Sequence, residues 1–81
     1  FGTDGFRIYP NPASDQLHID YPQDFEGANY EIMNLSGQKI AKGILREKSI
    51  SLNNKHFKAG KYILVIRGKN GTKSFIFIKK E

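Results

Sequence analysis

The sequence contains no cysteine and no tryptophan, and its 81 residues include only two histidines. Without cysteine, the chain has no disulfide, no thiolate nucleophile and no cysteine-based metal site. No apolar run approaches the roughly 20 residues that a membrane-spanning helix needs, and the N-terminus lacks the basic and then apolar pattern of a signal peptide. We therefore expect a soluble chain that does not insert into a membrane.

Groups that carry out catalysis are also sparse. Catalysis usually needs a nucleophile, a base and a group that orients the base, or a metal held by clustered ligands. His18 and His56 fit no zinc-binding spacing, and the glycines fit no phosphate-binding pattern. The acidic residues are scattered, whereas glycoside hydrolysis needs two carboxylates that face each other across a cleft. We predict that the protein is not an enzyme and has no catalytic, cofactor-binding or metal-binding residue.

Charge is distributed unevenly along the chain, which carries a formal net charge of +5. Residues 1–31 contain six acidic residues and one basic residue, whereas residues 32–81 contain twelve basic and two acidic residues. A basic surface can attract nucleic acid, above all where exposed aromatic side chains stack on bases. Phe75 and Phe77 share a strand face with other apolar residues, so we expect them in the core and predict no nucleic-acid partner.

Apolar and polar residues alternate with the two-residue period of half-buried strands, and no segment has a helical period. The alternation predicts seven strands, near residues 6–9, 16–21, 29–34, 38–45, 48–52, 62–67 and 72–80. This pattern predicts an all-β fold, a seven-stranded antiparallel β-sandwich with immunoglobulin-like or Greek-key connections, with a barrel as the alternative.

The glycine-rich, polar residues 1–5 have the composition of a linker from a preceding domain, which leaves residues 6–81 as the domain. Because the chain begins with Phe1 rather than Met, we expect it to be part of a longer protein.

Two turn sequences predict how strands pair. Asn34 and Gly37 favour a type I turn closed by a glycine bulge, which would place Ile32 opposite Ile40. Asn70-Gly71 favours a two-residue type I′ turn. The second turn would pair residues as follows: Leu64 with Phe77, Ile66 with Phe75, Ile63 with Ile78, and Val65 with Ile76.

The last hairpin carries apolar side chains on both of its faces, although a sandwich sheet normally buries one. An exposed aliphatic patch bordered by lysine and arginine is typical of a docking surface. We expect it to contact a protein partner or a second copy of the domain in a homodimer; the alternative is that an N-terminal strand or the crossover loop covers it. The patch consists of Ile63, Val65, Ile76 and Ile78, bordered by Lys61, Arg67 and Lys80.

Four stretches occur in a specific order: residues 8–13 (IYPNPA), 31–38 (EIMNLSGQ), 57–64 (FKAGKYIL) and the basic strand 73–80. Together they resemble the type A C-terminal sorting domain of the type IX secretion system, also called the Por secretion system, of Bacteroidota. The resemblance runs from about Phe6 to Glu81. Two departures are residues 56–58, which replace a leucine-rich stretch, and the final Glu81. Gly60 and Tyr62 match the family's Gly-x-Tyr motif, and Lys79 and Lys80 match its basic end.

The resemblance implies that the domain directs export of an attached N-terminal cargo domain. The cargo would reach the periplasm through a signal peptide, and the outer-membrane translocation and attachment machinery would recognise the folded sorting domain. A sortase-like cysteine peptidase would then cleave before Phe6 and link the cargo to surface lipopolysaccharide, leaving it secreted or at the cell surface. The alternative is a generic fibronectin-like or immunoglobulin-like binding or spacer module of a secreted enzyme.

The motif residues also have structural interpretations. In immunoglobulin-like sandwiches, a tyrosine at the start of the sixth strand places its ring in the core and its hydroxyl on the loop backbone. Tyr62 occupies this position in the expected strand order. Lys79 and Lys80 are either recognised directly or form a solvated strand end.

Overall fold

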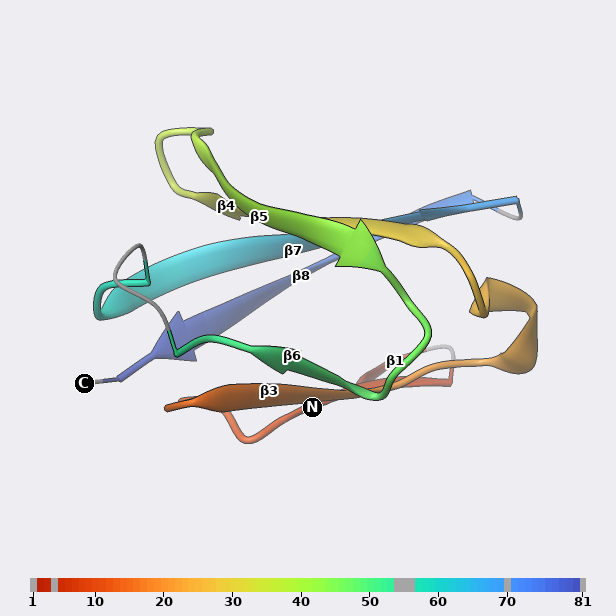
Figure 1. Ribbon diagram of the computed structural model, residues 1–81, viewed down its shortest axis with the longest axis horizontal. Coiled ribbons are helices and arrows are strands. Elements are labelled where there is room, and N and C mark those ends of the chain that lie inside the picture. The colour runs from red at the N-terminus through yellow and green to blue at the C-terminus, as the bar shows by residue number, and fades with distance from the viewer. Residues whose placement is uncertain (1, 4, 54–56, 70, 81) are drawn as a thin grey trace.

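Two antiparallel β-sheets lie face to face in the computed structural model (Figure 1), which describes residues 2–3, 5–53, 57–69 and 71–80. The predicted β-sandwich is confirmed. None of the described residues forms a helix long and apolar enough to span a membrane. His56 and Asn70 lie outside the described residues. The elements are β1 (Gly2–Thr3), β2 (Phe6–Tyr9), β3 (Gln16–Asp20), the 3-10 helix η1 (Gln23–Phe25), β4 (Asn29–Asn34), β5 (Lys39–Ile44), β6 (Ser49–Ser51), β7 (Gly60–Gly68) and β8 (Gly71–Lys79).

The order of strands is immunoglobulin-like. One sheet has the order β1-β2-β3-β6 and the other β5-β4-β7-β8. The chain crosses from one sheet to the other after β3, after β5 and after β6, so β7 pairs with β4 and not with the strand that precedes it. These crossovers are the Greek-key connections that the strand count predicts. β1 was not predicted: it lies within residues 1–5 and pairs with β2, while the assignment of residues 1–5 as a linker stays a prediction.

The core lies between the sheets, because alternate side chains of each strand point toward the facing sheet. Burying each large apolar side chain contributes about 1.5 to 3 kcal/mol. Phe75 and Phe77 are buried, as predicted. The largest fully buried side chains are Ile8, Leu17, Ile19, Ile32, Leu45, Leu52, Leu64, Ile66 and Phe77.

The turn after β4 forms as predicted, but the strand pairing beyond it does not. Asn34 Oδ1 accepts hydrogen bonds from the backbone N–H groups of Ser36 and Gln38, both at 3.0 Å, and Gly37 has φ 86°. Ile32 pairs with Ala41 rather than with Ile40, because the register shifts between Ile32 and Met33. The extra residue is accommodated as a β-bulge in β5.

The predicted register of the last hairpin is wrong by two residues. Leu64 lies opposite Phe75, and Ile63 opposite Ile76; the two strands close with Gly68 opposite Gly71. The turn therefore falls one position earlier than the Asn70-Gly71 signal predicts. Because side chains alternate with period two, this shift leaves every residue on its predicted face.

Candidate recognition surface

Three segments that are distant in sequence meet at one end of the sandwich, where β7 begins and β8 ends (Figure 1). Gly60 lies opposite Lys79 in the β7–β8 ladder. Ala13, from the segment between β2 and β3, forms a parallel bridge with Lys79. The structure thus brings together three of the stretches on which the family resemblance rests. We call this end, formed by residues 11–13, Gly60 and residues 79–80, the motif end.

The segment Asn11–Ala13 fastens the end of β8. Proline has no backbone N–H and so stops β2 from extending its ladder with β3. The Ala13 N–H donates to the Ile78 carbonyl at 2.7 Å, and the Ala13 carbonyl accepts from the Lys80 N–H at 2.8 Å. Asn11 Oδ1 accepts from the Ile78 N–H at 2.9 Å. The opening motif of the domain therefore holds its last strand, with the Ala13 side chain fully buried.

Tyr62 has the structural role that its position predicts. Its side chain is buried, its ring stacks on Phe77 with centroids 5.7 Å apart, and its hydroxyl donates to the Lys58 carbonyl at 2.6 Å. Gly60 is exposed and has φ 149°, a conformation that favours glycine. The Gly-x-Tyr motif thus shapes the corner at which β7 begins, and its role in recognition stays a prediction.

The two lysines of the motif end have different environments. Lys79 is buried, with 9% of its surface exposed, and its Nζ donates to the Lys80 carbonyl at 2.8 Å. Lys80 is exposed. A solvated strand end is therefore a correct description of Lys80 and a wrong one of Lys79. Direct recognition stays a prediction for both.

The aliphatic patch is smaller than predicted. Ile76 and Ile78 are 55% and 39% exposed, Ile63 is half-buried, and Val65 is buried at 7% exposure. Val65 does not belong to an exposed surface, because it lies on an inner strand between Glu31 of β4 and Ser74 of β8. The exposed part of the patch therefore follows β8, and its role in docking stays a prediction.

An ion-pair network lies beside Val65 on the outer face of this sheet. Glu31 is paired with Arg67 and with Lys39, whose Nζ lies 3.1 Å from the Glu31 Oε2. Hydrogen bonds from Arg67 and then Lys39 lower the pKa of Glu31, because both favour its charged form. Glu31, which Arg67 shares with Lys39, therefore offsets only part of the charge of Arg67, and Lys61 and Lys80 are the exposed lysines of the border.

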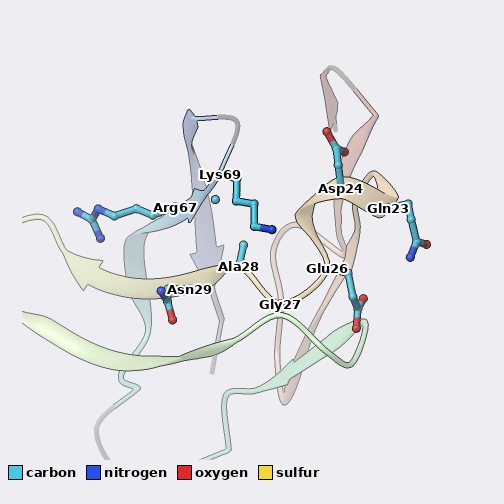
Figure 2. Close-up of a pocket in the computed structure, with 9 residues that line it drawn as sticks. Gln23, Asp24, Glu26, Gly27, Ala28, Asn29, Arg67 and Lys69 are labelled. Atoms are coloured by element: carbon cyan, nitrogen blue, oxygen red, sulfur yellow. The ribbon is translucent and has the colours of Figure 1, made fainter.

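A shallow hollow of about 620 Å³ lies at the opposite end, between η1 and the β7–β8 turn. Figure 2 shows the Lys69 side chain extending toward the η1 loop, and the Glu26 side chain pointing away from Lys69. Glu26 accepts a hydrogen bond from the Tyr21 hydroxyl at 2.7 Å. Burial of Tyr21 and, to a smaller extent, the neighbouring Glu26 carboxylate raise the pKa of Tyr21 to about 12. No three metal-ligating side chains cluster anywhere in the described part of the chain. Nothing in this hollow indicates a ligand.

These features define an immunoglobulin-like β-sandwich whose sequence motifs gather at one end. Residues 7–80 match the family described as the secretion system C-terminal sorting domain, and the chain belongs to this family. The predicted resemblance is confirmed, and the domain is a sorting signal of the type IX secretion system, which directs export of an attached cargo across the outer membrane. Sorting signals of this kind are not themselves catalytic.

A solved structure gives independent support for the fold. The chain is similar to part of PorZ, an essential bacterial surface component of the type-IX secretion system of Porphyromonas gingivalis, with a TM-score of 0.75 and 18% sequence identity. The similarity covers 96% of this chain and 12% of the PorZ chain, and at this identity it shows the fold alone. No curated protein matches the sequence.

Proposed function

We propose that the export machinery contacts the domain at its motif end. The observation that supports this proposal is the convergence of residues 11–13, Gly60 and residues 79–80, which are far apart in sequence and hydrogen-bonded or paired in the fold. Asn11, Gly60 and Lys80 are exposed, so a partner has access to them. Lys80 adds a positive charge, which favours a partner with an acidic surface.

We further propose a route for the cargo. A signal peptide on the longer protein takes the cargo into the periplasm, and the folded domain is then recognised at the outer membrane. A sortase-like cysteine peptidase cleaves within residues 1–5 and links the cargo to surface lipopolysaccharide. The glycine-rich composition of residues 1–5 supports a cleavable junction.

A charge reversal tests whether the export machinery contacts the motif end directly. In a fusion of residues 1–81 to a periplasm-directed fluorescent reporter, Lys80→Glu should lower export about tenfold, equivalent to about 1.4 kcal/mol of lost binding. Thermal unfolding of the purified domain should be unchanged, because surface substitutions usually alter stability by under about 0.5 kcal/mol.

Lys69→Glu is the matched control, because Lys69 is an exposed lysine of the same hairpin at the opposite end. This variant should be exported like the unmodified domain. Equal export of the two variants would show that the position of Lys80 has no special importance.

A further inference from the structure

The last strand presents a long backbone edge that is paired only at its end. β8 is the outermost strand of its sheet, and among the described residues it pairs beyond β7 only with the segment around Ala13. The backbone of Ile78 points away from β7, because its N–H and carbonyl bind Asn11 and Ala13. Backbone groups alternate in direction along a strand, and the β7–β8 register is continuous. The N–H and carbonyl groups of Thr72, Ser74 and Ile76 therefore also point outward.

The other three sheet edges are short or interrupted, whereas β8 is long and continuous. Short strands, lysines and bulges are the usual means of preventing strand addition at an edge. β1 and β6 have two and three residues. β5 carries Lys39 and Lys42, as β8 carries Lys73 and Lys79, but only β5 contains a register shift. β8 has nine residues, a continuous register and the exposed side chains of Ile76 and Ile78 next to its outward backbone groups.

The charge around this edge favours one kind of occupant. The sequence contains no aspartate or glutamate between Glu47 and Glu81. Lys61 and Lys80 are exposed beside β8, and Arg67 shares the Glu31 carboxylate with Lys39. Two copies of the domain joined through β8 would bring two basic edges together, which is unfavourable. An acidic strand would meet complementary charge.

We propose that the outward edge of β8 from Thr72 to Ile76 is a strand-acceptor site, at which an extended acidic segment of a partner protein adds to the sheet. The added strand lies along the same edge of β8 that Asn11 and Ala13 already contact at Ile78. Main-chain hydrogen bonds supply affinity, as in other cases of strand addition, and alternate aliphatic side chains contact Ile76 and Ile78. The backbone groups of this site, from Thr72 to Ile76, lie outside the motif end, although Lys80 contributes positive charge to both.

Nuclear magnetic resonance with a defined probe tests this proposal. A ten-residue peptide of alternating glutamate and valine, added to the ¹⁵N-labelled domain, should shift the amides of Thr72, Ser74 and Ile76 and slow their hydrogen exchange. A peptide of alternating lysine and valine should bind at least about tenfold more weakly, and added salt should weaken the acidic peptide. Shifts confined to other strands, or equal binding of both peptides, would overturn the proposal.

A proline variant tests the role of the backbone. Ser74→Pro removes one outward N–H, and proline is tolerated on an edge strand where its N–H position faces solvent. It should weaken the acidic peptide at least about tenfold, whereas Ser74→Ala, which keeps the N–H, should bind like the unmodified domain. Thr72→Pro provides the same measurement if Ser74→Pro does not fold. Unchanged peptide binding by the folded proline variant would reject an acidic partner strand. The same conclusion would follow if sedimentation showed that slow hydrogen exchange at this edge comes from dimers of the domain. The peptide measurement needs no export, so its outcome is independent of the proposed motif end.

Discussion

Replacing Tyr62 with alanine is expected to remove a large part of the domain's stability, whereas replacing it with phenylalanine is expected to leave most of that stability in place. Alanine removes a buried ring that stacks on Phe77 and contacts Phe57 edge-on at 5.4 Å. Truncation of a buried aromatic side chain to alanine costs about 3 to 5 kcal/mol. A chain of this length has roughly 4 to 12 kcal/mol of stability in total. Tyr62→Ala should therefore unfold at a much lower temperature than the unmodified domain when unfolding is followed by near-ultraviolet circular dichroism.

Tyr62→Phe isolates the hydroxyl, whose hydrogen bond to the Lys58 carbonyl contributes about 1 kcal/mol. Its unfolding midpoint in urea should fall while the slope stays constant. In the reporter fusion, Tyr62→Phe should be exported like the unmodified domain, and Tyr62→Ala should be exported less. Lost export of a stably folded Tyr62→Phe variant would contradict the structural role of this tyrosine and show that the hydroxyl is read directly.

Ala13→Asp is expected to separate the opening segment from β8. The Ala13 side chain is fully buried, and its backbone makes two hydrogen bonds to β8. Extra atoms in a packed site cost about 1 to 3 kcal/mol, and burying the carboxylate adds a desolvation cost that the neighbouring Lys79 offsets only in part. The hydrogen exchange of the Ile78 and Lys80 amides should therefore rise strongly, and thermal unfolding should occur well below that of the unmodified domain.

Ser14→Asp adds the same charge one position later, where the side chain is only half-buried. Its unfolding temperature and its Ile78 and Lys80 exchange should stay close to those of the unmodified domain. Equal behaviour of the two variants would mean that Ala13 does not hold the end of the last strand.

Much of the sandwich could be predicted from alternation alone. The side chains of β3 alternate with period two, so their inward and outward faces follow from the sequence. The pairing register could not be predicted in the same way. A two-residue shift of β8 against β7 keeps Leu64 and Phe75 on the inner face, so the hydrophobic pattern is equally compatible with both registers. The bulge at Ile40 is similarly invisible, because Ile40 and Ala41 both pack against the core.

The sequence predicts the motifs of the motif end one by one, but it does not predict that they meet in the fold. The joining element of the motif end is a parallel bridge at Ala13 together with one side-chain acceptor, Asn11 Oδ1, and such a contact leaves no periodic signal. The burial of Lys79 has a related cause. Lys79 stands two positions after Phe77 and four after Phe75, so the two-residue alternation of β8 places all three side chains on the inner face. This alternation is the sequence signal that predicts an inward-pointing Lys79.

We propose that the type IX machinery recognises residues 1–81 as a folded signal, through the surface of the domain. The most direct measurement uses the unmodified domain, fused behind a fluorescent reporter with a signal peptide, in a host that has the type IX system and in a strain that lacks its outer-membrane translocation machinery. We expect fluorescence at the cell surface or in the medium of the first strain and in the periplasm of the second. Reporter retained in the periplasm of both strains, with the domain folded, would contradict it.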